Sequence, residues 1–398
     1  MLRNCSFLFL LTFLFACGND NSKPKDLLAL SNDTVYVNID KRDTLFVCNF
    51  EKIKDLDEEV RIPLSDLVDK IDFVRLETTE ESYLGKWPGF NVTKKYLGAR
   101  ENRATYKLFD RKGKFIKEFG AVGKGPGEYT TLSADKIDDE TGDVFLLPWN
   151  RKELLRYGKD GKLKNPIPLK YGTVKGSFDI KGDEVSVVTI AFRPENVMAQ
   201  TFTTSGDSIN AMRAGHVATT HGYFSNSLFS FGNTPGVIDF HAWWFHPIRN
   251  DSLYHYLPHE NRFKPVFTLT FKEKPMIHTY MELPHHFLFS VSTSKQVGKN
   301  SFSTVPLGVY MVDKRDLSVK KIKLFNDFFG DADLYPFFCF KNGKFVKNIP
   351  AVTLIDDVTK MLEENKKMSK KQRSFLEKFV AETNEDDNPI LLIGNLKR

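Results

Sequence analysis

The feature that most constrains the fold of this chain is a short hairpin that recurs along it. In its clearest copy, residues 106–120, two strand-like runs flank the turn 110–113, whose glycine supplies the positive φ that such turns require. Apolar anchors of the first five copies stand 48, 45, 52 and 57 residues apart. A hairpin repeat of roughly 40–50 residues is typical of four-stranded β-propeller blades, and the copies predict about six blades. The five more degenerate copies are residues 155–163, 202–209, 250–271, 310–322 and 340–345.

Aromatic residues favour strands, and the chain contains 35 Phe and 13 Tyr. We therefore predict an all-β fold, a six-bladed β-propeller over residues 60–398, with a small helical insertion near the C-terminus. Residues 356–382 alternate apolar and charged side chains as amphipathic helices do. These helices either cover a blade or bind a partner. Segments 61–76 and 388–396 indicate strands near the two ends of the domain, and we expect them to share the blade that closes the ring.

Five motifs support a family resemblance: residues 62–78, 109–120, 123–129, 250–254 and 388–392. On these motifs the chain resembles the six-bladed β-propeller lipoproteins of Bacteroides and its relatives, which are akin to NHL-repeat and TolB-like propellers. The resemblance covers about residues 60–396, and the run Gly-Lys-Gly-Pro-Gly-Glu-Tyr at 123–129 is its most specific element. It implies a propeller fold and a location in the cell envelope. It implies no reaction and supplies no catalytic residues.

The amino-terminal residues have the organisation of a lipoprotein signal peptide. Arg3 is followed by an apolar run over residues 6–16, which is shorter than the roughly 20 residues that span a bilayer. The run ends in Leu-Phe-Ala before Cys17, which resembles the bacterial lipobox. We predict a signal peptide over residues 1–16, lipidation of Cys17, and a polar tether over residues 17–59. The alternative is an ordinary signal peptide with a chance cysteine.

The residue after Cys17 is Gly18, whereas an aspartate there would signal retention in the inner membrane. We therefore predict a lipid anchor in the outer membrane and leave open whether the protein faces the periplasm or the cell surface. Two further cysteines, Cys48 and Cys339, remain in the mature chain. In an oxidising compartment they either form a disulfide or stay as two buried thiols in separate strands.

The glycine-rich run 120–129 is the best candidate for a ligand contact. It is not a phosphate-binding loop, because Lys124 precedes Gly-Pro, which stops a helix, and not the Ser or Thr that opens one. We predict a shaped loop between blades on the rim of the central channel. In that position Lys124, Glu128 and Tyr129 would contact a ligand.

Other patterns predict no catalytic residue, no metal site and no cofactor. All nine histidines lie between His216 and His286, but without the spacing of a metal-binding motif. The aromatic segment 240–247 forms either a packed strand or a platform that stacks on sugars. A Gly-x-Ser-x-Gly nucleophile motif is absent. The net charge of +6 arises from interleaved acids and bases, which argues against a nucleic-acid partner.

We therefore expect an envelope-anchored module that binds or scaffolds an unidentified envelope protein, glycan or peptide. The alternative is a propeller enzyme, a lyase or hydrolase acting on glycan or peptide in the central channel. An enzyme requires several ionisable groups with shifted pKa values to converge on the channel mouth.

The lipid anchor gives a direct prediction. Cys17→Ser removes the thiol that carries the lipid, so the protein should move from the membrane fraction to the soluble fraction of the envelope. Fractionation followed by immunoblotting measures the change. A variant that stays in detergent-extractable membrane as the wild type does would contradict the anchor.

Overall fold

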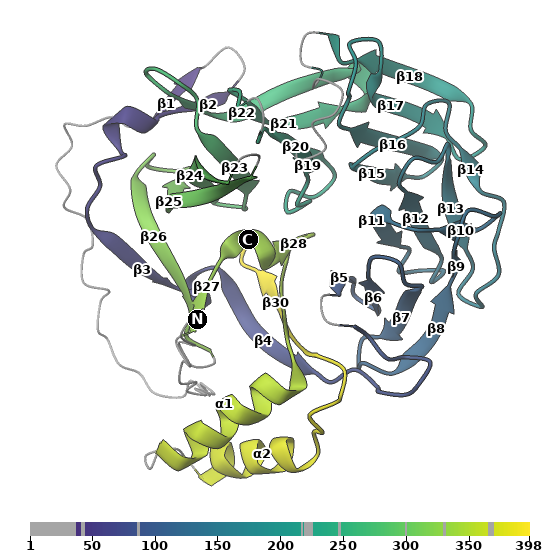
Figure 1. Cartoon of the computed structure of the whole chain (residues 1–398), viewed down its shortest axis with the longest axis vertical. Helices are drawn as coiled ribbons and strands as arrows, with labels where there is room; N and C mark the ends of the chain where they lie inside the picture. Colours follow the sequence, from purple (N-terminus) through teal and green to yellow (C-terminus); the bar gives the residue numbers. More distant parts are fainter. Residues whose placement is uncertain are drawn as a thin grey trace.

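The computed structural model describes residues 37–40, 44–85, 88–215, 218, 226–245, 248–298, 301–328, 332–364 and 370–398. The predicted signal peptide 1–16 and Cys17 lie outside the described residues. The strands form six blade sheets in a ring around a central channel, which confirms the predicted six-bladed β-propeller (Figure 1).

The first three blades each contain four antiparallel strands that follow the chain from the channel outward. The first is β5 (Gly89–Val92), β6 (Tyr96–Arg100), β7 (Tyr106–Asp110) and β8 (Phe115–Phe119). The second is β11 (Leu132–Ile137), β12 (Val144–Pro148), β13 (Glu153–Tyr157) and β14 (Ile167–Pro168). The third is β15 (Gly176–Lys181), β16 (Glu184–Thr189), β17 (Val197–Thr203) and β18 (Ser208–Arg213). A short parallel pair, β9 (Ala121–Val122) and β10 (Glu128–Tyr129), lies between the first two blades in the chain.

The fourth and fifth blades are extended at their outer edges by strands from the amino-terminal part of the chain. The fourth is β19 (Ser227–Phe229), β20 (Ile238–Trp243), β21 (Ser252–Leu257) and β22 (Arg262–Thr270), followed by β2 (Leu45–Asn49) and β1 (Val37–Asp40). The fifth is β23 (Ile277–Glu282), β24 (His286–Gly298), β25 (Ser301–Asp313) and β26 (Val319–Asn326), to which β27 (Ala332–Leu334) and β3 (Glu59–Pro63) both pair.

These additions shorten the predicted tether, which was expected to run to residue 59. Strand β2 pairs in parallel with β22, and β1 pairs with β2. Cys48 and Phe50 are buried in one core cluster with Phe267 and Phe289. The physical reason is that the apolar run 45–50 covers the open edge of a sheet, where unpaired backbone groups would otherwise remain.

The sixth blade closes the ring with strands from both ends of the domain. Its order from the channel outward is β28 (Phe340–Lys341), β29 (Lys344–Ile349), β30 (Ile390–Leu396) and β4 (Val68–Val74). Strand β30 pairs antiparallel with β4 over the register Leu391↔Val74 to Leu396↔Val68. The expectation that segments 61–76 and 388–396 share the closing blade is therefore confirmed for β4, whereas residues 61–63 belong to β3 in the fifth blade.

Two helices, α1 (Ala351–Glu364) and α2 (Lys370–Ala381), connect β29 to β30 and lie outside the closing blade (Figure 1). Leu354, Val358 and Met361 of α1 and Leu376 and Phe379 of α2 are buried in the core cluster of that blade. The predicted insertion is thus a cover over a blade.

No helix in the described part of the chain is long and apolar enough to cross a membrane. The short 3-10 helices are η1 (Phe50–Lys52), η2 (Leu64–Asp66), η4 (Pro258–Glu260) and η5 (Pro336–Phe338).

In five of the blades the recurring hairpin occupies the same position. In these it joins the two outer blade strands, as in β7–β8, where Gly113 has φ +90° and a Cβ would lie 1.8 Å from the Arg75 carbonyl oxygen. The copy at residues 340–345 differs, because it joins the two inner strands β28 and β29. The outer strand there is β4, which comes from the amino-terminal side.

Asn388 fastens the closing strand, which leads to a stability prediction. Its buried side chain donates to the carbonyl oxygens of Glu77 at 2.8 Å and Ser82 at 3.0 Å, and accepts from Leu84 N–H at 2.7 Å. Asn388→Ala leaves these groups unpaired, so the free energy of unfolding should fall by about 2–4 kcal/mol. Denaturant unfolding measures it, with exposed Asn384→Ala as control. Equal stability of the two variants would contradict the role of Asn388.

Candidate functional site

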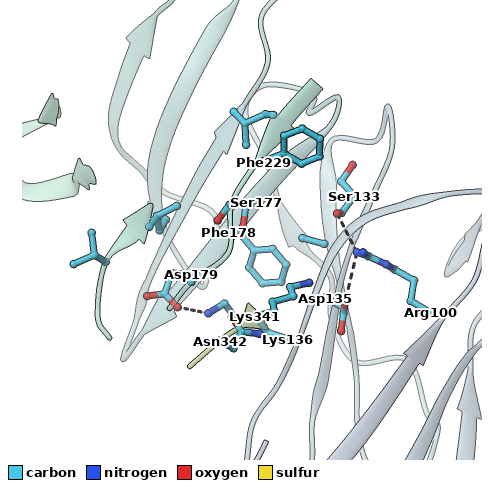
Figure 2. A pocket seen from close by; sticks show the side chains of 17 residues that line it. Arg100, Ser133, Asp135, Lys136, Ser177, Phe178, Asp179, Phe229, Lys341 and Asn342 are labelled. Atoms are coloured by element: carbon cyan, nitrogen blue, oxygen red, sulfur yellow. Dashed lines mark hydrogen bonds and ion pairs between the residues drawn. The ribbon is translucent and has the colours of Figure 1, made fainter. Parts of the chain in front are cut away.

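The six blades leave a polar cavity at the centre of the ring. This inner cavity has a volume of about 260 Å³ and lies between the innermost strands β11, β15 and β19, with β28 beside them (Figure 2). Five charged side chains from four blades line it: Arg100, Asp135, Lys136, Asp179 and Lys341.

Asp135 holds one wall of the inner cavity in place. Its nearly buried carboxylate accepts the Tyr106 hydroxyl at 2.9 Å through Oδ2, and its Oδ1 lies 3.3 Å from Arg100 Nη1. Arg100 Nη1 also donates to the Ser133 carbonyl oxygen at 3.0 Å. Burial and the neighbouring Asp135 raise the pKa of Tyr106 well above its usual value, so the phenol remains a donor. The first two blades are thereby joined by a satisfied polar network.

The second ion pair joins the next two blades. Lys136 Nζ on β11 lies 2.6 Å from Asp179 Oδ1 on β15. Lys136 also lines a wider cavity described below. Both carboxylates of the inner cavity are therefore already engaged by cations of the protein.

Lys341 is the third cation of the inner cavity. In the described part of the chain its amine has no hydrogen-bonding or ion-pair partner. Burial, followed by the nearby Arg100, lowers its pKa to about 8, while Asp135 opposes this shift. The inner cavity thus contains three cationic side chains and two carboxylates, and the unmatched positive charge is on Lys341.

The turn that follows Lys341 is braced by the opposite side of the channel. Asn342 N–H donates to the Phe231 carbonyl oxygen at 2.8 Å, and its side chain donates to Asn91 Oδ1 at 3.1 Å. Gly343 N–H donates to Asn233 Oδ1 at 3.0 Å. Asn342 and Gly343 have φ values of +52° and +69°. The turn therefore contacts the first and fourth blades, and these contacts fix the strand that carries Lys341.

A wider, basic mouth adjoins this turn. It has a volume of about 1300 Å³ and shares Lys136 and Asn342 with the inner cavity. Burial and the neighbouring Arg111 lower the pKa of Lys344, with further contributions from Lys94 and Arg398. More cationic than carboxylate side chains line this mouth. The six cationic side chains are Lys94, Lys136, Lys314, Lys344, Lys397 and Arg398. The three carboxylate side chains are Asp69, Asp139 and Glu282.

The family described as "Domain of unknown function (DUF4934)" matches residues 45–395 of this chain. The chain belongs to this family. None of the curated proteins compared with the DUF4934 chain matches it.

Two solved structures from Bacteroides are similar to the DUF4934 chain. A "putative exported protein" from Bacteroides fragilis NCTC 9343 has a TM-score of 0.54 at 13% identity, and the match covers 86% of this chain and 98% of that one. A member of the DUF4221 family from Bacteroides vulgatus ATCC 8482 has a TM-score of 0.37 at 11% identity, over 83% of this chain and 97% of that one. The first likeness supports the fold, and the predicted family of six-bladed propellers is confirmed in this coarse form.

The glycine-rich run of the DUF4934 chain is not on the channel rim, where it was predicted. Strands β9 and β10 lie at the outer edge of the ring (Figure 1), and Lys124, Glu128 and Tyr129 line none of the channel cavities described here. Glu128 accepts from Gly125 N–H at 2.8 Å, and the buried Tyr129 hydroxyl donates to the Phe119 carbonyl oxygen at 2.9 Å. The glycines allow this packing: a Cβ on Gly120 would lie 2.5 Å from the Tyr129 ring.

Cys48 and Cys339 are buried free thiols, which agrees with the second of the two alternatives and not with a disulfide. Cys48 belongs to the core cluster of the fourth and fifth blades, whereas Cys339 belongs to that of the closing blade. Burial raises their pKa values to about 12 and about 11. Both thiols therefore stay protonated and behave as small core side chains.

The histidines occupy separate environments. His241 and His278 are buried, which lowers their pKa values to about 3 and about 4. His255 Nε2 lies 2.6 Å from Glu282, whose other oxygen is 2.7 Å from Lys314 Nζ. Among the described residues no group of three or more His, Cys, Asp or Glu side chains could hold a metal ion. His216, His221 and His246 lie outside the described residues.

The described part of the aromatic segment, residues 240–245, contributes to the core. Phe240 and Trp244 are buried, and Phe240 stacks on Tyr254 at a centroid distance of 5.5 Å. This supports the packed-strand interpretation over a sugar platform at this segment.

Sequence reasoning did not find the five charged residues of the inner cavity. One signal was present, because β11 reads Leu-Ser-Ala-Asp-Lys-Ile, in which Asp135 and Lys136 interrupt an apolar strand. Lys341 had no such signal: it stands beside Asn342 and Gly343 in an ordinary hairpin turn.

The Asp135 network depends on a glycine, which gives a testable prediction. A Cβ on Gly98 would lie 1.7 Å from Tyr106 Oη and 2.9 Å from Ile137 Cδ1. Gly98→Ala should therefore displace the Tyr106 hydroxyl from Asp135 and lower the free energy of unfolding by about 1–3 kcal/mol. Gly172→Ala is the control, since its Cβ would meet nothing closer than 3.8 Å. Thermal unfolding compares them, and an unchanged Tm for Gly98→Ala would contradict the network.

Proposed function

We propose that this DUF4934 protein is a non-enzymatic binding module of the bacterial cell envelope whose central channel holds an anionic ligand. The observation that carries the proposal is the amine of Lys341 in the inner cavity, which has no partner among the residues that the structure describes. A cation without a partner in a partly enclosed site is costly unless a counter-charge is supplied. A carboxylate, phosphate or sulfate group of a ligand would supply it.

The surroundings of Lys341 favour an anion over a cation or a purely apolar ligand. Asp135 and Asp179 are engaged by Arg100 and Lys136, so neither carboxylate is free to neutralise a bound cation. The basic mouth adds further cationic side chains at the approach to the inner cavity. A positive field of this kind raises the local concentration of anions and speeds their association.

The envelope location rests on the sequence of residues 1–17. We propose that lipid on Cys17 anchors the protein to the outer membrane and that the residues before β1 act as the tether. Relationship to NHL-repeat and TolB-like propellers is part of this proposal. An envelope protein, a glycan or a peptide could each present the anionic group to the channel.

One observation favours the alternative, a propeller enzyme acting at the channel. The pKa of Lys341 is lowered to about 8, so part of the amine is neutral in mildly basic solution and could accept a proton. Mass spectrometry of a bound anion after long incubation with the protein at pH 8 separates the two functions. A binding module returns the ligand unchanged, whereas an enzyme returns a product whose formation is lost in Lys341→Met.

The binding proposal predicts a pH-dependent affinity that depends on Lys341. Below pH 8 the amine is charged and attracts the anion; as the pH rises above 8 the charge is lost, so the affinity should fall. At pH 7, Lys341→Met should weaken binding by about tenfold or more and remove most of the pH dependence. Isothermal titration calorimetry with acetate, inorganic phosphate, sulfate and glucuronate as probes measures both effects.

The control is Lys117→Met, which removes an exposed lysine from the outermost strand of the first blade. It should bind as the wild type does. Because the half-buried amine of Lys341 has no partner among the described residues, Lys341→Met should unfold no more easily than the wild type, which separates lost binding from lost folding. If no probe binds, or if binding is equal in wild type and Lys341→Met, the proposal is wrong.

A further inference from the structure

A group of aromatic side chains stands at a third opening of the channel. Tyr335, Phe337 and Phe338 lie at the short helix η5, and the Tyr335 ring is 5.4 Å from that of Phe337 and 5.2 Å from that of Phe338. Phe338 is 82% exposed and Tyr335 is 43% exposed. Exposed apolar rings are common singly, but adjacent ones at a cavity edge indicate a binding surface.

The backbone beneath these rings is fixed. Pro336 and Phe337 are buried, and Phe337 belongs to the core cluster of the closing blade. The amides of Phe338 and Cys339 donate to the carbonyl oxygens of Tyr335 at 3.2 Å and Pro336 at 3.0 Å. Phe338 therefore projects from an anchored turn, so the backbone beneath it loses little conformational freedom when a ligand lies against its ring.

The exposed ring and the unpaired amine border the same space. A cavity of about 280 Å³, the aromatic mouth, is lined by Phe338 and Phe90 together with Arg100, Asp135 and Lys341. Arg100, Asp135 and Lys341 also line the inner cavity, so the two cavities meet at these residues. One ligand can thus touch an aromatic face and a cation at the same time.

We infer that the ligand of this channel is a sugar acid, a pyranose that carries a carboxylate, with its ring against Phe338 and its carboxylate at Lys341. This inference rests on the proposed anion-binding function and names its ligand class. A pyranose has an apolar C–H face that packs on an aromatic ring and hydroxyls at its edge that require polar partners. Ser230 and Asn348, which line the aromatic mouth, offer such partners.

Other anions use only part of this arrangement. A simple phosphate or carboxylate would satisfy Lys341 but leave the Phe338 ring in water. A fatty acid would use the ring, but it would bury the polar side chains of the cavity without hydrogen bonds, which is costly. An apolar side chain of a partner protein would cover Phe338 without using Lys341. The sugar acid uses the ring, the amine and the polar edge together.

The experiment compares three classes of probe that separate the contribution of the sugar ring from that of the charge. Glucuronate and galacturonate carry both, glucose and galactose carry the ring alone, and acetate carries the charge alone. Ligand-observed NMR titrations are run at pH 7 with wild type, Phe338→Ala and Lys341→Met. Phe302→Ala is the matched control, because Phe302 is a 50% exposed phenylalanine on the β24–β25 hairpin that lines none of the channel cavities described here.

We expect one of the sugar acids to bind the wild type at least about tenfold more tightly than acetate and than the matching neutral sugar. Phe338→Ala should remove the preference for the sugar acid over acetate. Lys341→Met should remove the preference for the sugar acid over the neutral sugar. Phe302→Ala should change neither preference. If acetate binds as tightly as the sugar acids and Phe338→Ala has no effect, the sugar-acid inference is wrong while anion binding stands. If none of the anions binds, or if the neutral sugar binds equally well and Lys341→Met has no effect, both proposals are wrong.

Discussion

Closure of the ring by the β30–β4 pairing is the interaction on which the rest of the structure depends. The charged groups of the inner cavity come from the first, second, third and closing blades, so no single sheet contains the site. Their separation is set only when the last sheet takes β4 from the amino-terminal side and β30 from the carboxyl-terminal side. Asn388 fastens the same junction with three hydrogen bonds to residues 77–84. Because Lys341 is on the innermost strand of that sheet, closure also sets its position relative to Arg100.

A channel lined by charged residues is stable only if their charges are compensated. Within the protein, the charges of Arg100 and Lys136 are compensated by ion pairs with Asp135 and Asp179. These pairs each join neighbouring blades, so they also oppose sliding of one sheet past the next. Lys341 does not meet the condition, and its lowered pKa reflects that cost. Among the described residues Lys341 is without a counter-charge, and the proposed binding of an anion rests on this observation.

The hairpins in the outer parts of the blades made the fold predictable from the sequence. The residues of the inner cavity lie on the inner parts of the blades, and the sequence did not predict them. Outer hairpins such as β7–β8 end in a partly exposed strand, β8, and contain a turn glycine, Gly113, and both features are visible in the sequence. A middle strand such as β12 is buried throughout and reads only as an apolar run. The glycine-rich run 120–129 was the most specific motif, yet its glycines permit packing around Tyr129 at the outer edge. Arg100, Asp135 and Lys341 lie close together because the blades form a closed propeller ring. No local sequence pattern predicts that proximity.

The innermost strands explain how one fold can accept different ligands. Each pairs through one edge only, and alternate side chains along it point into the core or into the channel. In the two-residue strand β28, Phe340 is 1% exposed and packs on Phe345 at a centroid distance of 5.8 Å, whereas its neighbour Lys341 faces the cavity. Phe340 therefore secures the strand, and Lys341 can change without loss of that packing. The 13% identity to a structure of similar fold shows that few residues must be kept for that fold.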